Sequence, residues 1–551
     1  MLALHLPEGY HFMSRRSLAV PAILLGVALL VGACSSTPPA ATTSAAPAAS
    51  ASAAASTPAT SDAAVKIAIA AEPVSMDPAL NPVCCGYELA TMFDTLVIIQ
   101  PDASIGPSLA ESWTVDDRSI TFKLRTGVKF HDGTDFNADA VKSNLDRIVD
   151  PATKSTNALS ILGPYESSEV IDPSTIKVTW TRRFAAALIS MANTSLSMTS
   201  PTAAATGTLG DKPIGTGPFK FVEWVRGSEL RLERNDAYST IRPDLSNKGP
   251  AKFKNLTLQY AANVTTRANL VQTGQVDLTL LDGPDAVRLE SSTDINHVRY
   301  PTIFVRWFAI NAAKHPDPKV REAIATAVDR QSVVTAGAGG LGKVHYSTLP
   351  PPAFGYDPSV ESLVPHFDTA KAKQLLTDAG YTFGADGIAT KDGKKLELSL
   401  LTFSVDPYTS EAQIVQDNLA QAGIAVKIDA RETSTAITAA LAGEFDLYLA
   451  RYGMFDGSTL AGLFKTAATD AQKSALRLND PELDRLLDEG DTEVDLEKRK
   501  VIYKQVQELL ARSMTTFTLY SLEGDLFHAK RISNIEFNRD GSLQVSDLIV
   551  Q

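Results

Sequence analysis

Alternating apolar and polar positions predict short strands and amphipathic helices from about residue 65 onward. Residues 65–69 alternate in apolar character, as a half-buried strand does. Residues 112–115 and 120–124 alternate in the same way on either side of a polar turn at 116–118, and we expect a β-hairpin there. The folded part of the chain therefore begins with β-structure.

Four later segments predict helices, each with a recognisable first or last residue. Asn137, Asp317 and Asp368 each stand where a helix begins, and their side chains can accept hydrogen bonds from its first free amides. The fourth helix, predicted over 411–422, ends before Gly423, a residue suited to the left-handed conformation that follows many helices.

Strands and helices alternate in the second half of the chain. Apolar stretches at 424–428 and 445–449 predict strands that follow these helices, and such alternation favours an α/β architecture. After residue 62 we find no fixed-period repeat and no long Pro/Gly-rich break, so any domains are intertwined or closely docked.

The N-terminal segment has the pattern of an export signal. Arg15 and Arg16 precede an apolar run at 18–33, which is shorter than the roughly 20 residues that a membrane-spanning helix needs. Residues 31–34 resemble the bacterial lipobox. We predict a signal peptide over residues 1–33 and lipidation of Cys34; an ordinary secretory signal with a chance cysteine is the alternative.

Residues 34–62 predict a flexible tether. They are almost all Ala, Ser, Thr or Pro, which leaves too little apolar surface to offset the entropy of ordering. A tether suits a folded body that docks on a membrane partner. Met13 would be a more conventional start than Met1, and the sequence leaves both Sec and twin-arginine export open.

Charge and motifs argue against nucleic-acid binding and against catalysis. Because 51 Lys and Arg residues face 63 Asp and Glu residues, the chain has no basic surplus to attract a phosphate backbone. The eight histidines are scattered, with no zinc or serine-hydrolase motif. Carboxylate pairs such as Asp488 and Glu489 are interpreted as solvated faces, 337–342 as a glycine-rich loop, and His131 with Asp132 as part of a turn.

Three blocks of the chain, in the family's order, resemble the solute-binding proteins of oligopeptide, dipeptide and nickel ABC importers (family 5). The likeness extends from about residue 65 to the end of the chain. The blocks are residues 110–133, residues 213–219 with 235–238, and residues 308–311 with 320–324.

The resemblance implies an α/β, two-lobed fold of the periplasmic-binding-protein type (type II), with an extra domain in the N-terminal lobe. Ligand is then enclosed between the lobes of a monomer that uses no cofactor. The implied boundaries are 63–107, 210–300 and 515–551 for the first lobe, 108–209 for the extra domain, and 301–514 for the second lobe.

The function implied is that of a lipid-anchored, extracytoplasmic receptor and not of an enzyme. It would capture short peptides and deliver them to ABC permease subunits with their ATPase. Alternatives are a receptor for a nickel chelate, a glycoside or another non-peptide solute, a receptor that presents its ligand to a signalling partner, and a secreted hydrolase.

Candidate ligand-binding residues lie in the second lobe. In relatives, a loop there carries an aromatic residue, two aspartates and a proline, and one aspartate pairs with the ligand's α-ammonium group. In this chain Tyr452 stands for the aromatic residue and Asp456 for the later aspartate, while the first aspartate and the proline are missing. Arg451, Phe455 and Phe403 are further candidates.

The adjacent cysteines Cys84 and Cys85 lie in a loop that borders the cleft in this fold. In an oxidising compartment we expect them to form a disulfide with each other. This pair could contact the ligand, brace the loop or, when reduced, bind a soft metal. Tyr87 follows the pair and is also a candidate.

Overall fold

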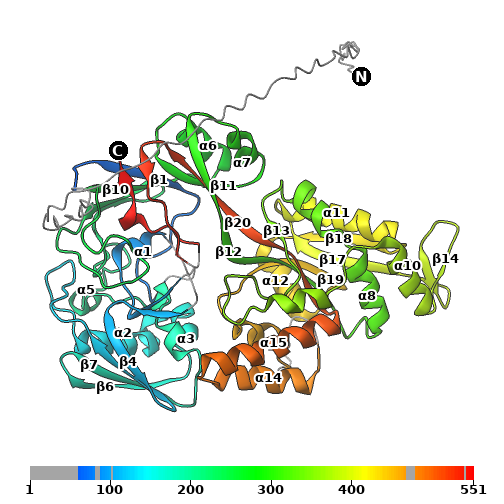
Figure 1. Cartoon of the computed structure of the whole chain (residues 1–551), viewed down its shortest axis with the longest axis horizontal. Helices are drawn as coiled ribbons and strands as arrows, with labels where there is room; N and C mark the ends of the chain where they lie inside the picture. Colours follow the sequence, from blue (N-terminus) through cyan, green and yellow to red (C-terminus); the bar gives the residue numbers. More distant parts are fainter. Residues whose placement is uncertain (1–59, 81–86, 101–103, 467–477, 539–540) are drawn as a thin grey trace, which may run out of the picture. The chain divides into compact units, whose positions relative to one another are not determined.

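The computed structural model describes residues 60–80, 87–100, 104–466, 478–538 and 541–551, all within the unit Pro58–Gln551. In this described part, eleven strands form one mixed sheet (Figure 1). Their spatial order is β18 (Ala425–Arg431), β17 (Glu397–Phe403), β19 (Leu447–Gly453), β12 (Ile295–Ile310), β20 (Thr516–Ala529), β11 (Leu278–Leu281), β1 (Ala64–Ile69), β10 (Asn255–Tyr260), β9 (Glu229–Arg234) and β8 (Phe219–Val225), with β13 (Lys343–Val344) paired to β20.

The long antiparallel pair β12 and β20 divides this sheet into two groups of strands (Figure 1). One end of the pair continues into β11, β1, β10, β9 and β8, which we call the first lobe. The other end pairs with β19 and continues into β17 and β18, which we call the second lobe. The register between the long strands is irregular between Pro301 and Val305, and proline has no amide to donate there. Each long strand thus crosses once between the lobes.

The first lobe confirms the strand predicted over 65–69, which is β1. Its core gathers residues from both ends of the chain, including Val65, Phe219, Leu278 and Leu526. Three helices and a small antiparallel pair complete it: α1 (Tyr87–Met92), α6 (Val264–Gln272), α7 (Gly283–Glu290), and β21 (Ile532–Ser533) with β22 (Ile549–Val550).

Residues 108–209, which we call the inserted domain, contain a four-stranded antiparallel sheet, and the apolar core beneath it also takes in Ala79, Leu96 and Val97. The predicted hairpin is confirmed as β4 and β5, and the predicted helix α2 begins where the Asn137 side chain accepts a hydrogen bond from the Ala140 amide at 2.9 Å. The elements are β4 (Ala110–Val115), β5 (Ser119–Leu124), β7 (Thr175–Trp180), β6 (Tyr165–Asp172), α2 (Ala138–Val149), α3 (Asn157–Leu162), α4 (Ala187–Ser190) and α5 (Pro201–Ala205); β2 (Val97–Ile99) and β3 (Ile105–Pro107) pair just before them.

The second lobe carries most of the longer helices. Asp317 and Asp368 cap two of them as predicted, by accepting hydrogen bonds from the Lys319 and Lys371 amides. Its helices are α8 (Pro318–Ala327), α9 (Arg330–Ser332), α10 (Thr369–Asp378), α11 (Tyr408–Gln421), α12 (Thr433–Ala442), α13 (Thr459–Phe464), α14 (Pro481–Thr492) and α15 (Leu496–Ser513), and a small sheet adds β14 (Thr382–Phe383), β15 (Ala389–Lys391) and β16 (Lys394–Lys395).

The helix predicted from Glu411 begins three residues earlier, at Tyr408 after Pro407. Glu411 does not mark a solvated first turn, because its side chain is fully buried and lies 2.7 Å from Arg306 on β12. The strands predicted at 424–428 and 445–449 are β18 and β19, which start one or two residues later and run further.

The glycine-rich stretch 337–342 follows a short helical turn and continues as a loop, as predicted. In the described ranges no helix combines the length and the apolar character needed to cross a bilayer. The sequence boundaries predicted for the two lobes and the inserted domain remain predictions.

Candidate ligand-binding site

A cavity of about 650 Å³ lies among the first lobe, the inserted domain and the second lobe. This volume falls within the roughly 300–1,000 Å³ typical of small-molecule sites. Its lining comes from stretches far apart in sequence: residues 90–99, 157–197 and 453–462, together with Arg242, Asp491, Asn538 and Ser542. The site therefore depends on how distant parts of the chain come together.

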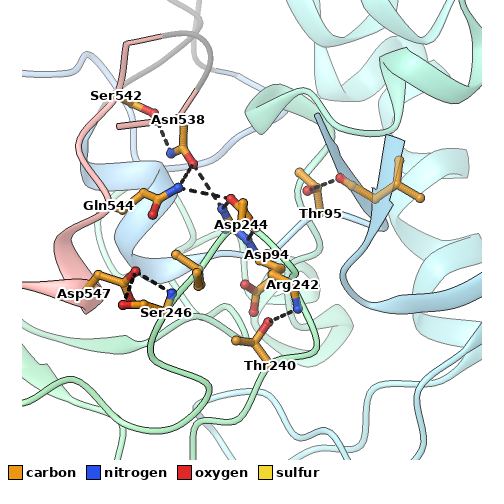
Figure 2. A network of polar contacts seen from close by, with 12 residues as sticks. Asp94, Thr95, Thr240, Arg242, Asp244, Ser246, Asn538, Ser542, Gln544 and Asp547 are labelled. Carbon is orange, nitrogen blue, oxygen red and sulfur yellow. Dashed lines mark hydrogen bonds and ion pairs between the residues drawn. The ribbon is translucent and has the colours of Figure 1, made fainter. Parts of the chain in front are cut away.

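The first-lobe wall carries a buried polar network (Figure 2). The Arg242 guanidinium donates to Asp244 at 2.7 Å and to the Asn538 side-chain oxygen at 3.1 Å. Gln544 donates to both of these acceptors, and Asn538 donates to Ser542 at 2.8 Å. Burial lowers the pKa of Arg242, but the hydrogen bond and the charge of Asp244 outweigh that effect and raise the pKa above its usual value. Arg242 therefore stays charged, with Asp244 as its partner.

Asp94 lies two residues after the end of α1 and is the acidic group of this wall. It accepts hydrogen bonds from the Thr216 hydroxyl at 2.9 Å and from the Tyr238 hydroxyl at 3.1 Å. Burial raises the pKa of Asp94, and Arg242 and the two hydroxyl donors oppose that rise only in part. Asp94 is thus held in place by the protein's own donors.

The inserted domain adds apolar surface and hydroxyl groups. Phe184, Ile189 and Ile161 supply the apolar part of this wall. The hydroxyls of Thr194 and Ser197 also line the cavity, and neither has a hydrogen-bond partner among the described residues. Buried hydroxyls of this kind can be satisfied by a ligand.

On the second-lobe wall, Asp456 is paired with Arg499. The two guanidinium nitrogens donate to the two carboxylate oxygens at 2.7 and 2.5 Å, and the Ser458 amide donates to one of them at 2.8 Å. Arg499 also donates to the Gly490 carbonyl and to the Tyr503 hydroxyl. Both charged groups are buried, so this is a bidentate internal ion pair.

Asp491, in the last turn of α14, is the other second-lobe carboxylate at the cavity. Its Oδ1 atom is buried and has no hydrogen-bond partner in the described part of the chain. Burial raises the pKa of Asp491 to about 6, while Arg499 lowers it and Asp456 raises it further. Its backbone carbonyl accepts a hydrogen bond from the Ala185 amide of the inserted domain at 2.8 Å.

Comparison with known proteins identifies the family. Residues 104–473 match the bacterial extracellular solute-binding proteins, family 5, in their middle region. The glutathione-binding protein GsiB of Shigella flexneri is 31% identical over 381 residues, which are 67% of this chain and 69% of that protein. The chain is a family 5 solute-binding protein. Such proteins bind solutes for ABC importers outside the cytoplasm, working with a permease and an ATPase, and are not enzymes.

Solved structures agree on the two-lobed fold. NikA of Brucella suis, in complex with Fe(III)-EDTA, has a TM-score of 0.77 and 24% identity, and the match covers 89% of this chain and all of that one. The oligopeptide-binding protein AppA of Bacillus subtilis, in complex with a nonapeptide, has a TM-score of 0.68 and 21% identity over 89% of this chain and 99% of that one. At these identities the likeness establishes the fold of this family 5 protein.

Of the residues predicted to contact ligand, Phe455 and Asp456 line the cavity of this solute-binding protein. The structure places Phe403 in the second-lobe core, where its ring meets Tyr408 edge to face. Tyr452 packs edge to face on Trp307.

Arg451 projects from β19 and lies over the Phe304 ring, 4.7 Å from its centroid. Tyr87 is the first residue of α1, and Cys34, Cys84 and Cys85 lie outside the described residues. Among the residues that the structure describes, no three His, Cys, Asp or Glu side chains gather as metal ligands.

Sequence reasoning missed Asp94, Arg242 and Asp491. Asp94 and Arg242 stand alone in their stretches, with no motif around them. Asp491 lies two residues after a carboxylate pair that we interpreted as a solvated face. One signal for Asp491 was available in the sequence. It is an acidic residue in the last turn of a helix, where the helix dipole disfavours a carboxylate.

Proposed function

We propose that this family 5 protein captures short peptides in the 650 Å³ cavity and delivers them to the permease of an ABC importer. The observation that carries the proposal is that both lobes wall one cavity while the long strands β12 and β20 cross between them. A ligand that touches both walls stabilises the closed arrangement, and a permease can recognise that arrangement.

The charges at the cavity favour a ligand with a cationic group. Three carboxylates, from Asp94, Asp456 and Asp491, line it together with one guanidinium, from Arg242. Arg242 is matched by Asp244 and Asp456 by Arg499, so the remaining balance is negative. A zwitterionic peptide with a free ammonium group suits this balance better than an anion does.

The relatives support peptides as the ligand class. GsiB is named for binding glutathione, a tripeptide, and AppA was solved with a nonapeptide. Glutathione itself carries a net negative charge at neutral pH, which suits this cavity less well than a neutral peptide does. We therefore propose uncharged or cationic short peptides as the preferred ligands.

We also propose that the mature protein is held at the membrane by a lipid on Cys34, with residues 34–62 as its tether. Metabolic labelling with a radioactive fatty acid tests this proposal. Label on the wild-type protein and its absence from Cys34→Ala would support the anchor; equal labelling of both would refute it.

The test of ligand class is native mass spectrometry of the body, residues 60–551, purified gently from its own host. Denaturation then releases any retained ligand for identification. A series of short peptides supports the proposal. A nickel chelate or a glycoside as the released species would assign the protein to another branch of the family.

A further inference from the structure

Asp491 is an unusual acidic residue for its place in the fold. It lies in the last turn of α14, where the negative end of the helix dipole disfavours a carboxylate, and that turn contains no basic residue. Across the described ranges, Asp491 forms no ion pair within 4 Å. The fold therefore does not stabilise this charge by itself.

Neighbouring carboxylates on α14 provide the contrast. Asp488 is paired with Lys465, and Glu489 is paired with Arg485, and both acids are largely exposed. Their charges are therefore solvated and matched. Asp491 differs from both because one of its oxygens is buried without a donor.

The charged groups around Asp491 act on it in opposite directions. Arg499 and Arg182 attract its charge, whereas Asp456 and Asp488 repel it. Arg499 is already bound to Asp456 in bidentate geometry, and Arg182 lies on an exposed turn. Burial is the main influence on its pKa, and a partly buried carboxylate with one fully buried oxygen favours a cation close to it.

A second, smaller pocket of about 170 Å³ adjoins the main cavity on the side of the inserted domain. It shares Phe184 and Ile189 with the main cavity, and between them lies Ala185, whose amide donates to the Asp491 carbonyl. Apolar side chains such as Trp180, Leu188 and Leu496 dominate its lining, and the charged residues Asp116, Asp117, Arg118 and Arg499 also lie along it. An apolar cavity of about 150 Å³ is large enough to hold a benzene ring. Asp491 thus lines the main cavity and is joined through its backbone carbonyl to Ala185, a residue of the smaller pocket.

We infer that Asp491 binds the ammonium group of a peptide's first residue and that the adjoining pocket receives that residue's apolar side chain. The inference deepens the proposed function and rests on it. In a peptide the ammonium group and the first side chain leave the same carbon atom, which suits a carboxylate that lines a cavity next to an apolar pocket. Rotation about the Asp491 Cβ–Cγ bond brings either oxygen toward the cavity.

A peptide mixture tests this inference on the body, residues 60–551. The mixture contains equimolar tripeptides X-Gly-Gly, where X is Phe, Leu, Ala, Ser or Glu, with an N-acetylated copy of each and with glutathione. Native mass spectrometry measures which peptides the protein enriches. Wild type is expected to enrich Phe-Gly-Gly and Leu-Gly-Gly at least about tenfold over their acetylated copies, since a charge-assisted hydrogen bond contributes about that much.

Two variants, each with a matched control, separate the two parts of the site. Asp491→Asn should abolish the preference for a free ammonium group, whereas Glu489→Gln, on the exposed face of the same helix, should retain it. Leu188→Trp, placed to fill the small pocket, should abolish the preference for Phe and Leu, whereas Leu159→Trp, at an exposed site on α3, should not.

The outcomes separate this inference from the proposed function. Equal enrichment of free and acetylated peptides, or an unchanged preference in Asp491→Asn, overturns the role of Asp491 and leaves the peptide receptor standing. Selective enrichment of glutathione or of Glu-Gly-Gly overturns the apolar pocket. No enrichment of any peptide by the wild-type protein overturns the proposed function itself.

Discussion

Asp456 and Asp491 lie in the same lobe and line the same cavity, but their carboxylates differ in the partners that the protein provides. Asp456 receives two guanidinium nitrogens from Arg499 and an amide from Ser458. Asp491 receives no donor at Oδ1 from any residue that the structure describes. The first carboxylate is therefore part of the protein's own framework, and the second is available to a ligand.

This difference shows that presence at a cavity does not by itself assign a binding role. The Asp456 pair joins the loop after β19 to α15, so its first effect is on stability. A ligand's ammonium group at Asp456 would compete with a buried guanidinium that is already in ideal geometry. At Asp491 the same group would relieve an uncompensated charge.

The largest effect should come from breaking the Asp456 pair. Arg499→Met leaves a buried carboxylate without its cation and should lower the free energy of unfolding by about 3–5 kcal/mol. Urea unfolding followed by tryptophan fluorescence measures the loss. The double variant with Asp456→Leu should recover part of it, and a loss below about 1 kcal/mol in Arg499→Met would remove the distinction between the two carboxylates.

Asp491→Asn should lower peptide affinity without lowering stability. Peptide affinity should fall by about 10- to 100-fold, because a charge-assisted hydrogen bond is lost. The free energy of unfolding without ligand should stay constant or rise, because a buried amide costs less than an unpaired buried charge. Calorimetry and urea unfolding on the same samples check both values; a less stable protein with unchanged affinity would make Asp491 a structural residue.

The pH should move binding and stability in opposite directions at Asp491. Its pKa is raised from 3.8 to about 6, so the folded state binds a proton that the unfolded state releases. Its contribution to stability is therefore complete below pH 4 and is lost as the pH rises through 6. Peptide affinity needs the ionised form and should fall about fivefold between pH 6 and pH 5.

The difference between wild type and Asp491→Asn isolates this dependence, because the other acids, Asp94 among them, titrate in both proteins. Binding by both proteins is measured at half-unit steps from pH 4.5 to 7.5. Parallel curves for the two proteins would contradict the prediction.

The smallest effect is expected on the exposed face of α14. Glu489→Gln removes one partner of Arg485, a residue that Glu482 also binds. Such surface pairs contribute about 0–1 kcal/mol, so stability and peptide affinity should both stay close to wild type. A large loss of affinity in this variant would mean that the whole acidic end of the helix attracts ligand.

The fold was largely predictable because its local signals are strong. Asn137, Asp317 and Asp368 each cap the helix that follows, and the hairpin at 110–124 forms from the two predicted strands. Family motifs supplied the two-lobed arrangement. Local patterns could not supply the long pair β12 and β20, because its partners are more than 200 residues apart along the chain.

The site was predicted only in part, since burial and pairing are properties of the assembled protein. The sequence pointed to the loop 451–457, and Phe455 and Asp456 of that loop line the cavity, while their contact with ligand stays a prediction. It could not show that Arg499 would form an ion pair with Asp456. Nor could it separate Asp491 from the solvated Asp488 and Glu489, because the burial of Asp491 depends on the inserted domain, some 300 residues earlier.

The most direct test of the central claim is a crystal structure of the body, residues 60–551, with the peptide that it enriches most strongly. We expect the peptide in the cavity between the lobes, its terminal nitrogen within hydrogen-bond distance of an Asp491 carboxylate oxygen and its first side chain in the smaller pocket. A peptide bound with its ammonium group elsewhere and Asp491 facing only water or protein would contradict the account.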